Sequence, residues 1–446
     1  MEAQAKENVD GTSGTQQPDT GPTLAPTTTN PEIELAMMAY LDDHPAAIRR
    51  LQEHQLQHAQ TVGRPGVPTI NIQMLPFGGG KPYPPALLNA DDYVVGFDGH
   101  HDPIHAQNWS RGKKVGITAI LVLDSLAATL ASSIFSPGSV DVETYFEVGP
   151  EVTTLAISVF ILGYAFGPLA FGPLSELFGR RLPTLVGSCG FGIFNVAVAV
   201  SKDYQTLVIC RFFAGVFGSC PLALVAAVLA DMFNNQSRGI AVAIISATIL
   251  CGPLVGPMIG GFIAKSYLGW RWTAYVPAFM AFTSCVLAII FQDESHAPRI
   301  SMYKGSELRR QTRNWGIHAK QEEVELSVKE LMTKNLSRPL QLLLEEPVIL
   351  VITVCTSFIY GITYLSLSAF ATIFGQTHHF SRGVAGLPCL GMIVGVFLEL
   401  FAVICTNRNY VRQLRANNDV PIPEWRMPLA MLGSVCFATD IYWAAN

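Results

Sequence analysis

Four ionisable side chains lie inside long apolar stretches of the sequence, namely Asp124, Arg211, Glu399 and Asp440, and we give little weight to Asp440 because it lies near the end of the chain. A charge in a hydrocarbon environment is costly unless it faces a partner or a water-filled cavity, so such residues are functional by default. A carboxyl group near a guanidinium can gain and lose a proton as its surroundings change, which is the chemistry of proton relays. We therefore predict that Arg211 and Asp124 form a proton-coupling pair and that Glu399 is a third candidate. A fixed structural salt bridge between Asp124 and Arg211 is the alternative.

The apolar stretches have the length and composition of transmembrane helices. Half of the 446 residues are hydrophobic and only 14% are charged, whereas about a quarter are charged in soluble domains. A membrane-spanning helix needs about 20 apolar residues. The sequence therefore predicts an all-α polytopic membrane protein with about nine transmembrane helices. They are Val115–Phe135, Leu155–Phe171, Leu182–Val200, Leu207–Ala230, Ile240–Ile263, Ala274–Phe291, Val348–Phe374, Val384–Cys405 and Pro428–Ala445.

A short charged hinge separates the second and third apolar stretches. We expect the second helix to end at Gly172-Pro173, because proline interrupts the hydrogen-bond ladder of a helix. A link this short between two spans must turn at the membrane surface, and we predict that it is a gating hinge. Asp231, at the end of the fourth span, is expected to cap its helix or to pair with Arg238. The residues of the gating hinge are Gly172, Glu176, Gly179, Arg180 and Arg181.

The fifth apolar stretch repeats the pair Gly-Pro at an interval of four residues. Glycines at this spacing leave one helix face nearly bare, and each proline removes one backbone hydrogen bond. Close helix approach combined with a built-in kink suits a gate, whereas simple tight packing is the alternative. The residues concerned are Gly252, Pro253, Gly256, Pro257, Gly260 and Gly261.

Together these motifs resemble the major facilitator superfamily. The hinge is similar to the loop between the second and third helices of that superfamily, where a glycine and an acid precede Gly-Arg-Arg. The Gly-Pro repeat resembles the antiporter motif of drug:proton antiporters with twelve spans. Arg211, followed by Gly215 and Gly218, resembles the fourth-span motif, whose arginine is thought to take part in proton coupling. The resemblance implies the major facilitator fold, in which two pseudo-symmetric bundles of helices rock around a substrate site at the membrane midplane.

The segments outside the apolar stretches carry a closer resemblance. Asp102-Pro103 and Asn108-Trp109 before the first span, and Leu308–Lys320 between spans six and seven, look like fungal polyamine and multidrug exporters. This resemblance implies proton-coupled efflux of small organic compounds, which are polyamines, drugs or secondary metabolites. We divide the chain into a largely disordered cytoplasmic N-terminal region (1–92), a pre-span amphipathic and basic segment (93–114), an N-terminal six-helix bundle (115–291), a cytoplasmic central loop (292–346) and a partial C-terminal bundle (347–446).

Lysine and arginine are distributed unevenly between the loops. If the N-terminus is cytoplasmic, nineteen of these bases lie in inner loops or in the pre-span segment, and four lie in outer loops. In membrane proteins the cytoplasmic loops carry the excess of basic residues. We therefore expect a cytoplasmic N-terminus. The resemblance to fungal exporters implies the plasma membrane or the vacuolar membrane, with a small-molecule substrate, protons and the lipid bilayer as partners.

The chain ends after the ninth apolar stretch, whereas twelve spans are expected of this group. We therefore expect a chain truncated after the ninth span, with a complete first bundle and an incomplete second bundle. Two functions remain open: a proton-coupled exporter, or a truncated relative that transports poorly and has a regulatory role or none. The sequence has no signature of an intramembrane enzyme and no nucleic-acid-binding patch, and we expect no metal and no cofactor. The oligomeric state is left open.

Overall fold

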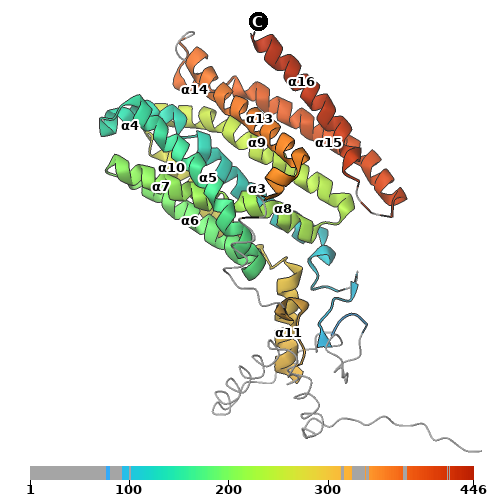
Figure 1. The fold of residues 1–446 in the computed structure, drawn as a ribbon. Helices are drawn as coiled ribbons and strands as arrows, with labels where there is room; N and C mark the ends of the chain where they lie inside the picture. The colour runs from blue at the N-terminus through green and yellow to red at the C-terminus, as the bar shows by residue number, and fades with distance from the viewer. Residues whose placement is uncertain are drawn as a thin grey trace, which may run out of the picture. The chain divides into compact units, whose positions relative to one another are not determined.

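The computed structural model describes residues 77–80, 93–99, 102–312, 316–323, 337, 341–374, 379–418, 420 and 422–445. Disorder was expected for residues 1–92. Apart from residues 77–80, these residues lie outside the described part of the chain. The described chain is nearly all helical (Figure 1). Its one isolated bridge is parallel and joins Val94 to His318.

The helices follow the apolar stretches of the sequence. In chain order the main elements are η3 (Ala106–Asn108), α3 (Arg111–Ser133), η4 (Ser136–Gly138), α4 (Ser139–Phe146), α5 (Pro150–Phe178), α6 (Arg181–Val200), α7 (Tyr204–Gly218), α8 (Cys220–Met232), α9 (Asn235–Lys265), α10 (Trp272–Phe291), α11 (Ala297–Thr312), η5 (Lys320–Glu323), α13 (Pro347–Thr372), α14 (Arg382–Ala385), α15 (Cys389–Ala416), η7 (Pro423–Arg426) and α16 (Met427–Ala445).

Eight helical segments of the described chain are long and apolar enough to cross a membrane. They coincide with the first eight apolar stretches, and the ninth stretch lies in α16, whose described apolar part, Met427–Phe437, is shorter. The fourth stretch is divided into α7 and α8 by Pro221, which stands in the first turn of α8. The described residues therefore confirm an all-α polytopic membrane protein.

The second span is longer than the sequence indicated. α5 continues through Gly172-Pro173 to Phe178, so the expected helix end is wrong. A proline deprives a helix of one hydrogen bond, but within a membrane the released backbone groups are satisfied by local adjustments and by serine or threonine side chains. Pro173 releases the carbonyl of Leu169, four residues earlier, and the helix nevertheless continues. The helix ends at Gly179, whose φ of 84° is left-handed.

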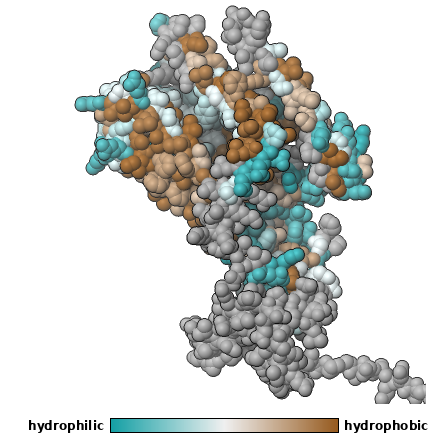
Figure 2. All heavy atoms as spheres, in the orientation of Figure 1, coloured by the Kyte–Doolittle hydropathy of each residue, from teal (hydrophilic) through white to brown (hydrophobic). Residues whose placement is uncertain are grey.

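The first six spans pack closely on one another. α3 contacts α9 and α10, α5 contacts α7, and α6 contacts both α7 and α10. Small residues allow the helices to come this close. At Gly163, for example, an added Cβ would lie 2.9 Å from the backbone nitrogen of Val216, so there is no room for a side chain. Membrane helices approach one another most closely where small residues meet. Apolar side chains lie on the outside of these helices, and Figure 2 shows hydrophobic residues gathered over α5, α6 and α7.

α13, α14 and α15 join the first six helices through α9. Leu254 of α9, Leu367 of α13 and two residues of α15, Cys389 and Val396, form an apolar cluster at this junction. A hydrogen bond of 2.9 Å between the hydroxyls of Ser132 and Tyr364 links α3 to α13. The remaining faces of α13 and α15 present exposed apolar side chains within the described residues.

Outside the spans, residues before α3 pack against residues on both sides of the end of α11. The parts of the pre-span segment (93–114) that make these contacts lie in Tyr93–Gly99 and Asp102–Trp109. The backbone of Val95 donates to the carbonyl of His318 at 2.9 Å, and the backbone of His318 donates to the carbonyl of Tyr93 at 3.1 Å. Beside this bridge, a small apolar core is formed by Phe77, Val95, Leu308 and Ile317.

Candidate functional site

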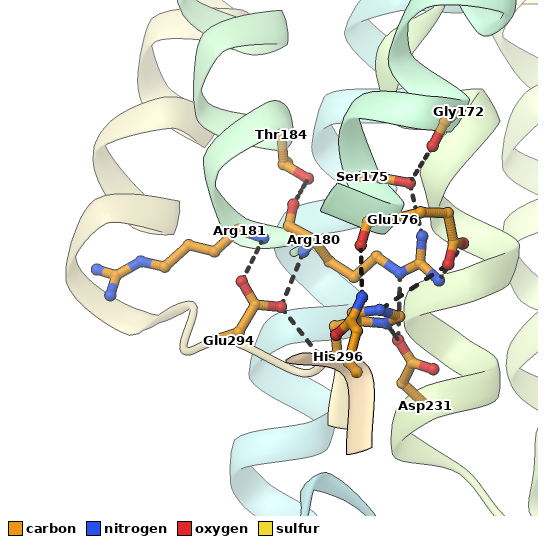
Figure 3. A network of polar contacts seen from close by, with 10 residues as sticks. Gly172, Ser175, Glu176, Arg180, Arg181, Thr184, Asp231, Glu294 and His296 are labelled. Carbon is orange, nitrogen blue, oxygen red and sulfur yellow. Dashed lines mark hydrogen bonds and ion pairs between the residues drawn. The ribbon is translucent and has the colours of Figure 1, made fainter. Parts of the chain in front are cut away.

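The turn between α5 and α6 is built around a carboxylate that comes from the central loop. Glu294 accepts hydrogen bonds from the backbone N–H groups of Arg180 at 2.8 Å and Arg181 at 3.2 Å (Figure 3). Gly179 is required at this turn for two reasons. Its φ of 84° is unfavourable for any residue with a side chain, and an added Cβ would lie 2.5 Å from the carboxyl carbon of Glu294.

The guanidinium of Arg180 ties the turn to two helices. It donates to the hydroxyl of Ser175 at 2.6 Å and to the carboxylate of Glu176 at 2.9 Å, both on α5. It also donates to the carboxylate of Asp231 on α8 at 3.3 Å. Charge-assisted hydrogen bonds of this kind are about twice as strong as neutral ones. Asp231 therefore pairs with Arg180 and not, as the sequence suggested, with Arg238.

The central loop adds two further side chains to this arrangement. The imidazole of His296 lies 3.9 Å from a carboxylate oxygen of Glu176 and 3.9 Å from one of Asp231. The side-chain amide of Gln321 donates to the backbone carbonyl of Glu176 at 3.4 Å. Figure 3 shows the imidazole of His296 pointing toward the side chains of Arg180 and Asp231. We call the hinge network the set formed by Ser175, Glu176, Arg180, Arg181, Asp231, Glu294 and His296.

Sequence reasoning placed five residues at the hinge but missed Glu294 and His296. The structure brings Glu176, Gly179, Arg180 and Arg181 together, whereas a Cβ added at Gly172 would meet nothing within 4 Å. Gly172 contributes its carbonyl, which accepts the hydroxyl of Ser175. The only available signal for the two missed residues was their position directly after the sixth span, where the chain leaves the membrane.

Asp124 lies on α3 in the interior of the first six helices and is 1% exposed. Its two oxygens accept hydrogen bonds from the hydroxyl of Ser188 on α6 at 2.6 Å and from that of Ser284 on α10 at 2.8 Å. Each serine hydroxyl also lies 2.9 Å from a carbonyl of its own helix, which gives it a second acceptor. Because a hydroxyl can both donate and accept, this arrangement suits an ionised and a protonated carboxyl group equally.

Arg211 lies on α7 and is also 1% exposed. Its Nη1 donates to the carbonyl of Ala131 at 3.2 Å, and its guanidinium carbon lies 3.9 Å from the centroid of the Phe135 ring. Its Nε and Nη2 have no hydrogen-bond partner within the described part of the chain. Ala131 is seven residues beyond Asp124, about 10 Å along α3. The expected pair of Asp124 and Arg211 is therefore not formed, and neither is the alternative salt bridge.

Glu399, the third candidate for proton coupling, lies on α15 and is exposed. Its neighbours along the helix are apolar, and Phe397 and Leu398 are 59% and 64% exposed. Among the described residues, no hydrogen bond or ion pair connects Glu399 to Asp124 or Arg211. The structure therefore brings two of the three candidates into one bundle and leaves the third apart from them.

The glycines of the Gly-Pro repeat form the surface of α9 that contacts α3. A Cβ added at Gly256 would lie 2.9 Å from the backbone nitrogen of Ile134, and one at Gly260 would lie 3.0 Å from the carbonyl carbon of Ile134. Gly252 meets Thr129 in the same way, and Gly261 is buried as well. Tight helix packing, the alternative considered for this motif, is thus present.

The prolines of the repeat make a second link between α9 and α3. Pro257 has no N–H group, so the carbonyl of Pro253 loses the hydrogen bond that a helix normally supplies. The hydroxyl of Ser133 on α3 donates to this carbonyl at 2.9 Å. The motif therefore combines close packing with a backbone hydrogen bond that comes from the neighbouring helix.

Two tyrosines were missed by sequence reasoning. Tyr164 on α5 has a buried hydroxyl without a hydrogen-bond partner among the described residues. Tyr364 on α13 reaches across to Ser132 on α3. Tyrosines within apolar stretches attract no notice in a sequence, because aromatic residues are common there. Within the described residues no group of three or more His, Cys, Asp or Glu could hold a metal ion, and the absence of a metal site stays a prediction.

The geometry defines a class of protein: a polytopic helical membrane protein with a buried acid, a buried arginine and a charged hinge in its first six helices. Residues 121–445 match the Major Facilitator Superfamily. The chain belongs to this superfamily, and the resemblance recognised in its sequence is confirmed.

Named relatives come from fungi. The major facilitator superfamily multidrug transporter FLU1 of Candida albicans is 42% identical over 369 residues, which are 82% of this chain and 60% of that protein. The multidrug transporter TPO1_2 of Candida glabrata is 39% identical over 433 residues, 97% of this chain and 73% of that protein. The chain thus spans less than two thirds of the length of FLU1. Among solved structures, the proton:xylose symporter XylE aligns with a TM-score of 0.49 and 20% identity, covering 67% of this chain and 70% of that chain.

Proposed function

We propose that this chain forms a proton-coupled exporter of small organic compounds, and that it is neither an enzyme nor a transport-deficient regulator. The observation that carries the proposal is the carboxyl group of Asp124, which is buried among the membrane-spanning helices and whose hydrogen-bond partners within the described part of the chain are two hydroxyls. The relatives named as multidrug transporters support the substrate class and favour export over the regulatory alternative. Polyamines, drugs and secondary metabolites are the compounds we propose.

Asp124 is the proposed proton carrier. When its carboxyl group takes up a proton, the serine hydroxyl at the protonated oxygen accepts that proton's hydrogen bond and turns its own hydrogen toward the carbonyl of its own helix, 2.9 Å away in either case. The other serine hydroxyl continues to donate to the unprotonated oxygen. The three side chains can therefore follow a change of protonation state without a change in helix packing. Arg211 contributes a fixed positive charge to the same bundle, and its Nε and Nη2 groups, which are buried and have no hydrogen-bond partner among the described residues, could bind a polar substrate once the cavity opens to them. Glu399 remains a candidate for a second acid on the transport path.

The hinge network is the proposed gate. Alternating access requires the two bundles to rock about the central site, and such a motion changes the turn between neighbouring spans. In the observed conformation the turn is held by Arg180, which joins α5 to α8, and by Glu294, which joins it to the central loop. Opening the gate would require these hydrogen bonds to break. The Gly-Pro repeat is proposed to keep α3 and α9 in contact during this change.

We further propose the orientation and the division of the chain. The excess of lysine and arginine in alternate loops supports a cytoplasmic N-terminus. In this orientation the hinge, the pre-span segment and the central loop all lie on the cytoplasmic side. The proposed membrane is the plasma membrane or the vacuolar membrane. The domain boundaries stay as the sequence predicts them, with the first bundle at residues 115–291 and the central loop at 292–346.

Reconstitution into proteoliposomes tests the proposal. An imposed pH gradient should drive accumulation of ethidium or spermidine, with proton movement followed by a trapped pH-sensitive dye. Asp124→Asn should abolish gradient-driven transport, because an amide cannot carry the proton. Glu151→Gln is the matched control, since Glu151 is an exposed acid in the first turn of α5. Glu399→Gln reveals whether a second acid takes part.

Two results would count against the proposal. If the chain moves neither ethidium nor spermidine with a gradient of either direction, the transport function is refuted. If Asp124→Asn transports as well as the Glu151→Gln control, Asp124 is not the proton carrier, and the proposal fails in its central step.

A further inference from the structure

A buried ion pair joins the pre-span segment to the middle of α11. Lys304 of α11 and Asp102 of the pre-span segment lie 3.4 Å apart, and their side chains are 1% and 0% exposed. The ammonium group of Lys304 also donates to the backbone carbonyl of Gly96 at 2.9 Å. Charged side chains are almost never fully buried unless they are paired. This pair therefore fixes the position of Lys304, and with it the rotation of α11 about its own axis.

Asp102 is held from every side by groups of the pre-span segment itself. Its carboxylate accepts from the backbone N–H of Ile104 at 3.0 Å and from that of Asp98 at 3.3 Å. The side-chain amide of Asn108 donates to the carbonyls of Asp102 at 2.9 Å and Gly99 at 2.8 Å. Burial raises the pKa of Asp102, but the two backbone N–H groups and Lys304 outweigh it, so the pKa is lowered overall. The carboxylate is thus a rigid ionised anchor.

The turn after α11 is fixed in the same neighbourhood. Arg309 donates to both carboxylate oxygens of Glu322, at 2.9 and 3.0 Å, and to the carbonyl of Ile317 at 2.9 Å. The neighbouring residue His318 forms the bridge with Val94. α11 is therefore attached to the pre-span segment at Lys304 and again just beyond its own end.

The central-loop members of the hinge network lie directly before α11. His296 directly precedes α11, eight residues before Lys304, which is about 12 Å along a helix. Glu294 lies two residues earlier, and its carboxylate also accepts the backbone N–H of His296 at 2.9 Å. Beyond α11, Gln321 donates to Glu176. If α11 rotated about its axis or shifted along it, Glu294, His296 and Gln321 would therefore move relative to the turn between α5 and α6.

We propose that Asp102 and Lys304 are positioning residues of the hinge network. By fixing α11, they keep the carboxylate of Glu294 on the N–H groups of Arg180 and Arg181. The hinge turn is then controlled from the segment before the first span, through a helix of the central loop. The inference concerns the stability of the turn and holds whether or not the chain transports a solute.

Hydrogen–deuterium exchange of the full chain in lipid nanodiscs tests the inference directly. The readout is the exchange rate of the backbone amides of Arg180 and Arg181, which donate to Glu294. Lys304→Met leaves the carboxylate of Asp102 buried and unpaired, which is strongly destabilising for the contact. We expect exchange at these two amides to rise by about tenfold or more. Glu294→Gln serves as the reference for a turn that has lost its carboxylate.

The matched control is Arg310→Met on the same helix. Arg310 pairs with Glu307 at 3.4 Å, but its side chain is 76% exposed, and an exposed pair of this kind contributes little. Exchange at Arg180 and Arg181 should not change in this variant. Lys304→Arg, which keeps the charge, should restore most of the protection. A merely structural role confined to the pre-span segment would not produce this pattern at the hinge.

One outcome overturns the inference. If Lys304→Met raises exchange in residues 93–99 and 316–319 while the amides of Arg180 and Arg181 keep their protection, the ion pair does not act on the hinge. If Lys304→Met unfolds the helical bundle, seen as rapid exchange throughout α3 and α9, Asp102→Asn is measured by the same criterion, because it removes the charge and keeps the shape. Failure of the transport assay would leave this result intact, so the two proposals can fail separately.

Discussion

Replacing Gly260 by alanine should loosen the contact between α3 and α9. The added Cβ would lie 3.0 Å from the carbonyl carbon of Ile134 and closer still to its oxygen, whereas ordinary contact begins at 3.4 Å. These are backbone atoms, so no side chain can rotate away. The helices must separate by about 0.4 Å to clear the carbon and by more to clear the oxygen.

The expected cost follows from this separation. A gap of about 0.5–1 Å forfeits a quarter to a half of the attraction between two packed atoms, and an extra methyl group in a packed interior costs about 1–3 kcal/mol. Glycine to alanine within a helix also stabilises the helix by about 1 kcal/mol. Gly395→Ala on α15 provides the matched control, because nothing lies within 4 Å of its added Cβ. The propensity gain is shared by both variants, and their difference reports the packing cost alone.

The assay is unfolding in mixed micelles with increasing sodium dodecyl sulfate, followed by tryptophan fluorescence. We expect Gly260→Ala to be less stable than Gly395→Ala by about 1–3 kcal/mol. Equal stabilities of the two variants would refute the reasoning, because they would show that α3 and α9 do not meet at Gly260.

Three further predictions concern single side chains. Ser133→Ala should lower the free energy of unfolding by about 0.5–2 kcal/mol in the same titration, because the carbonyl of Pro253 is left without a donor. Arg180→Lys should increase amide exchange at the end of α8 in nanodiscs, since an ammonium group cannot reproduce the planar set of donors that reaches Ser175, Glu176 and Asp231 together. The ion pair of Asp102 should fail in acid: its pKa is lowered on folding, so its contribution to stability is complete above the ordinary value of 3.8 and is lost as the pH falls through the lower folded value. Pepsin cleavage of the pre-span segment should accordingly rise below about pH 4, and in Asp102→Asn it should already be high above that pH.

The spans and the family could be predicted from the sequence because both depend on local pattern. An apolar stretch of sufficient length must cross the membrane as a helix whatever its neighbours are. The hinge residues lie within ten positions of one another, so their spacing is visible directly. The end of α5 was misplaced because proline was treated as it would be in water, whereas a membrane helix continues through it.

The partners across the fold could not be predicted. Glu294 is 114 residues away from Arg180, and no periodicity connects the two positions. Asp124 and Arg211 were both correctly placed among the spans by their apolar surroundings. Their separation depends on how far α3 and α7 are shifted along one another, and composition contains no information about that shift. The same holds for Ser188 and Ser284, which look like ordinary small residues of a membrane helix.

The proline at position 257 makes α9 depend on its neighbour. A helix with a missing N–H group usually bends where the bond is absent, but here a serine of α3 occupies the vacant carbonyl. We therefore expect α3 and α9 to move together as one rigid unit. Because α9 also contacts α14 and α15, we expect a displacement of those later helices to shift α3, the helix that carries Asp124. A movement of the second half of the chain would thus change the position of Asp124 through direct helix contacts, without the participation of a loop.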